Sequence, residues 1–149
     1  MEARGALEAH FPGRGTYALS VVVAGPRAGT EDPAMRATLA RVRAALLGDR
    51  AISGVLAPRA GQGISPDRST AVVVGPAGAA PDEMVKAAGR LKTRLARLSS
   101  PGLAVRLTGT AAIWSDFNAA NKAAMLKSEM LSWPLTLALL WRDWPAPGG

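Results

Sequence analysis

The chain carries one short pattern twice: a run of β-branched residues that ends in a Gly-Pro pair. The first copy, Val-Val-Val-Ala-Gly-Pro, occupies residues 21–26, and the second, Ala-Val-Val-Val-Gly-Pro, occupies residues 71–76. A β-branched run that is closed by a turn signal is typical of a buried strand. The repeat therefore predicts two buried strands, over residues 17–25 and 70–75, that begin two similar halves of one fold.

An amphipathic helix is predicted after each of these strands. In the first half, Asp32 is placed to cap a helix that has Pro33 at its first position and ends at Gly48. The apolar stripe of this helix is Met35, Leu39, Val42 and Leu46. In the second half, Asp82 caps or nearly caps a helix. Its apolar stripe is Met84, Ala88, Leu91, Leu95 and Leu98.

Two further strands complete the pattern. A short strand is predicted over residues 51–57, and residues 103–108 alternate apolar and polar side chains, as a half-solvated strand does. The order strand-helix-strand-strand-helix-strand defines a ferredoxin-like α+β fold. Its first and third strands are central, which agrees with their continuous apolar runs. The loop that contains Gly61-Gln62-Gly63 is interpreted as a flexible connection.

Composition excludes most catalytic classes. The 149 residues include no cysteine, which excludes disulfides, cysteine-ligated zinc, iron–sulfur clusters and thiol nucleophiles. The single histidine, His10, would have to serve any Ser-His-Asp triad, and it cannot by itself supply a zinc site built on two or three histidines. We therefore predict that the chain is not an enzyme, that it has no catalytic, cofactor-binding or metal-binding residue, and that it uses no cofactor.

The formal net charge of +7 invites a nucleic-acid interpretation, which the rest of the sequence does not support. Arginine makes up most of the 18 basic residues in a chain rich in Ala, Gly and Pro, a mixture typical of GC-rich genomes. Aromatic residues form only 5% of the chain, and the central strands carry valines instead of a stacking platform. No nucleic-acid partner is expected.

A basic stripe is predicted on the second helix, and its members are Lys86, Arg90, Arg94 and Arg97. Such a stripe binds phosphates or acidic headgroups in some proteins, but it is more often the solvated face of an amphipathic helix. Gly25 and Gly75 precede helices, as phosphate-binding loops do, yet neither lies in a phosphate-binding glycine pattern. We interpret these features as structural.

A long helix is predicted from about Thr110 to Met130, and it leads into an apolar run that ends at residue 141. Trp133 and Pro134 lie near the start of this run, as such residues often do where a membrane helix begins. The run is shorter than the roughly 20 residues that span a bilayer. A core helix, an interfacial helix and a truncated span therefore remain open at this point.

Two carboxylates lie on the long helix. Asp116 and Glu129 are thirteen residues apart, which is about 20 Å along a straight helix, so they cannot act as a catalytic pair. Two interpretations of these residues remain open. Either both are solvated helix charges, or Asp116 makes a fixed contact beneath the domain and Glu129 marks the membrane interface, where it gates substrate entry.

The stretch 107–140 resembles the junction between the first extracytoplasmic domain and the second transmembrane helix of MmpL-type (MMPL family) transporters, in the resistance-nodulation-division (RND) superfamily. The matching residues are Thr108 and Gly109 after the last strand, Asp116 in the next helix, and Glu129 and Pro134 at the membrane entrance. The ferredoxin-like domain is similar to the porter subdomain of the family, and residues 5–13 are similar to the segment after its first membrane helix.

The resemblance implies five parts. These are a lead-in at 1–15 after a missing first membrane helix, a ferredoxin-like porter-type domain at 16–109, a helical stalk at 110–130, a truncated transmembrane helix start at 131–141, and a non-family tail at 142–149. No signal peptide and no complete membrane span is visible in the sequence. The expected protein is thus a fragment, and a frameshift, an early stop or a mis-called gene would each produce such a tail.

The function that the resemblance implies is that of an extracytoplasmic domain of a transporter that exports lipids or other hydrophobic compounds, with proton-driven transport in the intact family. The implied partners are the remaining membrane helices, the second porter domain, the membrane, and a hydrophobic or lipid substrate. The implied location is the cell membrane, with the domain on the extracytoplasmic side. The alternative is a free-standing soluble ferredoxin-like module that binds an acidic ligand or a nucleic acid.

Overall fold

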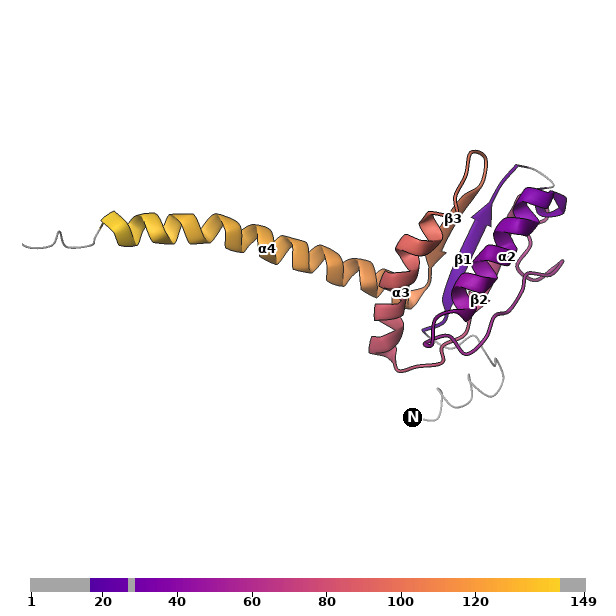
Figure 1. The fold of residues 1–149 in the computed structure, drawn as a ribbon, viewed down its shortest axis with the longest axis horizontal. Coiled ribbons are helices and arrows are strands. Elements are labelled where there is room, and N and C mark those ends of the chain that lie inside the picture. Colours follow the sequence, from indigo (N-terminus) through magenta and orange to yellow (C-terminus); the bar gives the residue numbers. More distant parts are fainter. Residues whose placement is uncertain (1–16, 27–28, 143–149) are drawn as a thin grey trace, which may run out of the picture. The chain divides into compact units, whose positions relative to one another are not determined.

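A computed structural model describes residues 17–26 and 29–142 (Figure 1). The predicted lead-in at 1–15, with His10, and the tail beyond residue 142 lie outside these residues. The elements in chain order are β1 (Leu19–Ala24), the short 3-10 helix η1 (Gly29–Glu31), α2 (Pro33–Leu47), β2 (Thr70–Gly75), α3 (Pro81–Ala96), β3 (Ala104–Thr108) and α4 (Thr110–Arg142).

The three strands form one antiparallel sheet in the order β2-β1-β3. β1 is central, because Val22 lies opposite Val72 of β2 on one side and opposite Arg106 of β3 on the other. The strands predicted over 17–25, 70–75 and 103–108 are therefore present, within one or two residues at their ends. Their order is the one that a ferredoxin-like sheet gives to its third, first and fourth strands.

The remaining predicted strand, over residues 51–57, is wrong as a regular strand. The segment makes isolated bridges instead, one of which places Leu56 opposite Val74 of β2. Gly54 weakens the run and Pro58 ends it, since proline has no N–H to donate to a ladder. The backbone groups of Leu56 and Val74 still exchange hydrogen bonds of 2.8 and 3.1 Å. The outer edge of β2 is therefore occupied, although by an irregular segment.

Both predicted amphipathic helices form, and they lie side by side on one face of the sheet (Figure 1). α2 begins as predicted, because Asp32 accepts a hydrogen bond of 2.7 Å from an amide of the first turn and Pro33 follows it. At α3 Asp82 is not the cap, but it lies near the helix start, which was the other predicted alternative. Ala80 is the N-cap, Pro81 takes the first helical position, and Asp82 lies within the first turn.

The core lies between the sheet and these two helices. β1 buries every second residue, so one face of the sheet meets the helices. The buried helix residues that belong to the predicted stripes are Met35, Val42, Leu46, Met84, Ala88, Leu91 and Leu95. Leu39 and Leu98 pack against the core but are only partly buried. The predicted stripes are thus confirmed as the faces that the helices bury.

α4 is one helix of 33 residues, and Pro134 lies inside it. Pro134, which the sequence places near the start of the apolar run, therefore lies inside a continuous helix and does not begin one. Because proline lacks an N–H, the carbonyl of Met130 has no partner four residues ahead. Two residues after the proline, the Thr136 hydroxyl donates a hydrogen bond of 2.9 Å to the Ser132 carbonyl. The predicted stalk and the apolar run that follows it share a single helix.

The described residues divide into two compact units, one within residues 1–115 and the other within residues 116–149. The first unit holds the sheet, α2, α3 and the first turn of α4, in which Ala111 and Ala112 are buried. The second unit consists, in its described part, of the rest of α4.

Candidate functional site

The predicted basic stripe of α3 is partly used in ion pairs within the α/β unit. Lys86 Nζ lies 2.7 Å from Glu83 Oε1 and 3.8 Å from Asp82 Oδ2. The hydrogen bond with Glu83 raises the pKa of Lys86 above its ordinary value. Arg90 forms an ion pair of 3.1 Å with Asp49. The structure therefore assigns Lys86 and Arg90 to structural contacts.

Asp49 joins the end of α2 to α3. Its carboxylate accepts hydrogen bonds of 3.1 and 3.3 Å from Arg90 and one of 3.0 Å from the Ala51 amide. Partial burial by itself raises the pKa of this carboxyl group, but the hydrogen bonds outweigh burial, and the net pKa of Asp49 is lowered.

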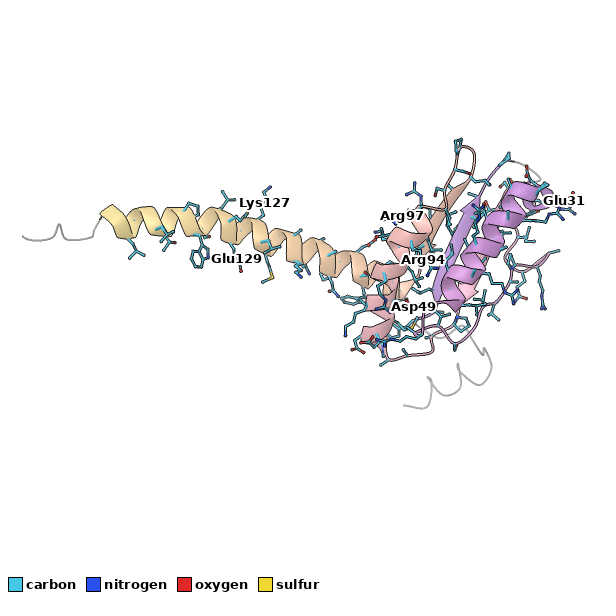
Figure 2. The ribbon with its side chains drawn as sticks, in the orientation of Figure 1. Glu31, Asp49, Arg94, Arg97, Lys127 and Glu129 are labelled. Carbon is cyan, nitrogen blue, oxygen red and sulfur yellow. The ribbon has the colours of Figure 1, made fainter. Side chains whose placement is uncertain are left out.

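The other two residues of the stripe, Arg94 and Arg97, form no ion pair with the residues that the structure describes. Both lie at the C-terminal end of α3 (Figure 2). Cations are favoured there by the helix dipole, so a bound anion is not needed to explain them. The interpretation of the stripe as structural stands.

The glycine turns serve packing. A Cβ at Gly25 would lie 2.7 Å from Leu103 Cδ2, and a Cβ at Gly75 would lie 3.3 Å from Ile52 Cγ2. These glycines give neighbouring side chains room, and they do not form a phosphate cradle. In the loop after residue 58, the carbonyl of Gly63 accepts a hydrogen bond of 2.7 Å from an amide of β2, so this loop is anchored to the sheet edge.

In the second unit, apolar side chains dominate α4 after Glu129. No charged residue occurs between Glu129 and Arg142. We define the apolar end of α4 as residues 130–140. Its exposed large side chains are Met130, Leu131, Trp133, Leu137, Leu139 and Leu140. The exposed fraction reaches 80% at Met130 and 68% at Trp133. These residues lie on several sides of one helix, and Ser132 and Thr136 are the polar side chains among residues 130–140. The apolar end therefore keeps a narrower polar face than an ordinary surface helix does.

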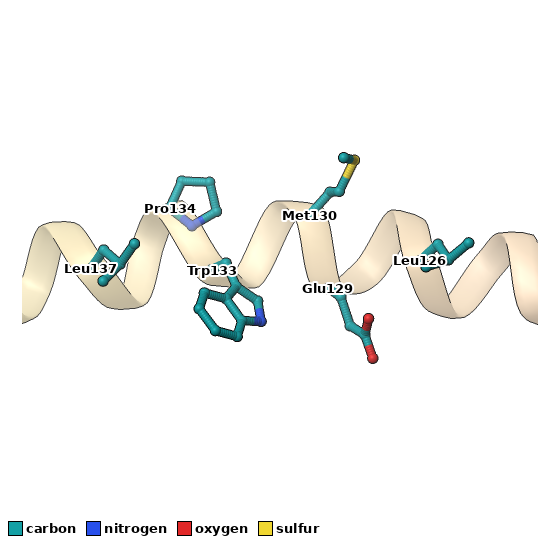
Figure 3. A pocket seen from close by; sticks show the side chains of 6 residues that line it. All are labelled: Leu126, Glu129, Met130, Trp133, Pro134 and Leu137. Carbon is teal, nitrogen blue, oxygen red and sulfur yellow. The ribbon is translucent and has the colours of Figure 1, made fainter.

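A shallow depression of about 450 Å³ lies along this part of α4 (Figure 3). Its lining residues are Leu126, Glu129, Met130, Trp133, Pro134 and Leu137. Glu129 and Trp133 extend to the same side of the helix, one turn apart. Sequence reasoning identified Glu129, Trp133 and Pro134, and the structure brings them together on neighbouring turns.

Sequence reasoning missed Leu126 and Leu137 as members of this surface. The signal that could have found them is their spacing of seven residues before and four residues after Trp133, which places them on its face of the helix. The other carboxylate of α4, Asp116, is exposed and does not belong to this depression. The predicted separation of the two carboxylates is confirmed.

Among the helices of the described residues, none combines the length and the apolar character that crossing a bilayer requires. Within the same residues, no three histidine, aspartate or glutamate side chains gather closely enough to hold a metal ion.

Comparison with family models gives a match to the MMPL family over residues 1–142. The match covers both the α/β unit and α4. Comparison with curated proteins gives no match.

Proposed function

The chain belongs to the MMPL family of RND-type membrane transporters, and on this premise we propose that its α/β unit is an extracytoplasmic, porter-type domain of such a transporter. Two features support a ferredoxin-like assignment: the strand order β2-β1-β3, and the irregular segment 51–57 at the edge where the second strand of that fold belongs.

The observation that carries the proposal is the change of character along α4 at Glu129. Before this residue α4 carries charged side chains, including Lys122 and Lys127, and after it the helix is apolar on several sides up to residue 140. A helix of that kind is stable where its apolar end meets lipid or other membrane helices. We propose that α4 enters the membrane over residues 129–134, with the exposed Trp133 at the interface.

We further propose that the cargo is a lipid or another hydrophobic compound and that proton movement through membrane helices drives export. The α/β unit then acts as part of the conduit. We propose that it contributes no catalytic residue, binds no metal or cofactor, and is not an enzyme. Its partners are the membrane helices and the second porter domain of the transporter.

Cysteine labelling tests the location, and the absence of native cysteine makes the background low. Gln62 is exposed in the loop beside β2, and Ala88 is 1% exposed in the core. With the gene expressed in intact cells, we expect a membrane-impermeant maleimide to label the Gln62→Cys variant in the membrane fraction. The matched Ala88→Cys variant should be labelled only after denaturation.

Labelling of Gln62→Cys only after the cells are permeabilised would place the domain in the cytoplasm and overturn the proposal. Recovery of the chain in the soluble fraction, with both variants folded, would favour the free-standing module.

A further inference from the structure

A second surface of the α/β unit, unrelated to α4, forms a small amphipathic groove. It lies between α2 and the irregular segment that covers the edge of β2, and its volume is about 250 Å³. Val73, which is 2% exposed, lines it together with Leu39, Val55 and Pro58. Arg36 and Arg43 also line the groove. An apolar lining with two cations is the composition of a site for a ligand that has both an apolar part and an anionic part.

The two guanidinium groups lack a counter-ion among the described residues. α2 contains no acidic residue, and the acidic side chains of the described part of the α/β unit are already engaged. Their partners are Arg68 for Glu31, the Ala34 amide for Asp32, Arg90 for Asp49, Ser65 and Ser69 for Asp67, and Lys86 for Asp82 and Glu83. An added anion would therefore meet two cationic groups that no acidic side chain of the described residues neutralises.

The two arginines also share one side of α2. They are seven residues apart, which is two helical turns or about 10 Å along the axis. Both side chains are long, so both can approach an anionic group at the mouth of the groove.

The dimensions and hydrogen bonds of the groove restrict the occupant. A helix with its side chains is about 10 Å wide and does not fit a volume of 250 Å³. An added strand at β2 is blocked, since Leu56 and Gly63 already hydrogen-bond to the amides of Val74 and Val72. A fully hydrated free anion gains nothing from the apolar lining.

We propose that this groove binds an anionic amphiphile, with its chain on Val73, Leu39 and Val55 and its carboxylate or phosphate group at Arg36 and Arg43. This proposal depends only on the geometry of the α/β unit, and it adds a binding site to the proposed location of the domain. Binding can be measured on the purified chain, so its failure and the failure of the membrane assignment are distinguishable.

The test uses the full 149-residue chain and dodecyl phosphate below its micelle concentration, followed by amide NMR shifts. We expect saturable shifts at Leu39 and Val55. The double variant Arg36→Gln/Arg43→Gln should weaken binding by about tenfold or more, because charge-assisted hydrogen bonds are lost. The matched control is Arg41→Gln, an exposed arginine of the same helix that does not line the groove, and it should change the affinity by less than about twofold.

A second variant tests the contribution of the apolar lining to binding separately from that of the two arginines. Ala40 lines the groove from an exposed position of α2, so Ala40→Leu keeps the helix intact and narrows the groove. It should weaken dodecyl phosphate binding with both arginines present. Inorganic phosphate and the uncharged dodecyl maltoside should each bind far more weakly than dodecyl phosphate.

The proposal is overturned if neither variant weakens the binding, or if the shifts occur only along α4. Equal affinity for inorganic phosphate would indicate a simple anion site, and equal affinity for dodecyl maltoside would indicate unspecific apolar contact. Tighter binding of a hexaglutamate peptide would indicate an acidic protein partner. Each of these results contradicts the assignment.

Discussion

At the scale of single residues, Asp49 makes the contact whose loss we expect to matter most in the α/β unit. Its side chain is 10% exposed and accepts hydrogen bonds from Arg90 and from the Ala51 amide. Asp49→Ala leaves these donors without an acceptor, which costs about 1–3 kcal/mol of unfolding free energy. Arg90 is 48% exposed, so Arg90→Ala should cost less. Urea unfolding measures both variants.

The matched control is Arg41→Ala, at an exposed position of α2 where no ion pair with described residues is lost. Its unfolding free energy should stay within about 0.5 kcal/mol of the parent. An equal loss in Arg41→Ala and Asp49→Ala would contradict the role of Asp49.

The lowered pKa values of Asp49 and Asp67 predict an acid-sensitive fold. The hydroxyl of Ser65 is the largest cause of the shift at Asp67, whose pKa falls to about 2. A carboxyl group with a depressed folded-state pKa stabilises the protein above its unfolded pKa, near 3.8, and this contribution is lost as the pH falls through the folded-state value. The urea midpoint should therefore fall between pH 4 and about pH 2. Asp49→Asn should reduce the change of the urea midpoint with pH. An unchanged pH profile in this variant would contradict a contribution of Asp49 to acid sensitivity.

Gly109 occupies a position that only glycine fits. Its φ is +110°, and a Cβ there would lie 2.7 Å from the carbonyl oxygen of Ala18. Gly109→Ala therefore combines backbone strain with a backbone clash, and we expect a loss of about 2 kcal/mol or more by thermal unfolding. The control is Gly54→Ala, where a Cβ meets nothing within 4 Å. Similar stabilities of the two variants would contradict this assignment.

Among single residues, local contacts could be predicted from the sequence and long-range contacts could not. The Asp32 cap was predictable, because it depends on a neighbouring amide and on Pro33. The pairing of Arg90 with Asp49 was not, because it joins residues 41 positions apart that only the packing of α2 on α3 brings together. The basic stripe looked like a solvated face, and sequence alone did not reveal which of its members form ion pairs.

At the scale of elements, the two Gly-Pro repeats predicted β1 and β2 well, because buried valine runs leave few alternatives. The segment 51–57 failed as a strand because its β-branched residues are separated by Gly54 and followed by Pro58. The α3 cap was misplaced by two residues, since Pro81 sets the helix start and leaves Asp82 one position inside.

The outer edge of β3 depends on one hydroxyl group. Ser99 Oγ accepts a hydrogen bond of 3.0 Å from the Val105 amide, which points away from β1. Ser99→Ala should lower the unfolding free energy by about 0.5–1.5 kcal/mol and leave this amide open to pairing with another chain. Urea unfolding and sedimentation at two protein concentrations measure these effects. Ser99→Thr keeps the hydroxyl group, so it should give the parent values in both measurements. An unchanged unfolding free energy in Ser99→Ala would contradict the role of the Ser99 hydroxyl at this edge.

At the scale of the whole molecule, one candidate site could be predicted in part from the sequence, and the other could be found only in the structure. The α4 surface was partly predictable, because Glu129, Trp133 and Pro134 lie close together along one helix. The groove at Arg36 and Arg43 was not, because its other wall is an irregular segment whose position depends on hydrogen bonds to β2. Continuous elements can be predicted from periodicity, whereas sites between elements require the fold.

We propose above that α4 passes from water into the membrane near Glu129. Spin labels at Lys122→Cys, Leu131→Cys and Leu137→Cys, in membranes from expressing cells, test it most directly, because all three positions are exposed on α4. We expect that a water-soluble nickel chelate reaches the label at position 122 and that dissolved oxygen preferentially reaches the labels at 131 and 137. Equal access of the nickel chelate to all three labels would contradict it.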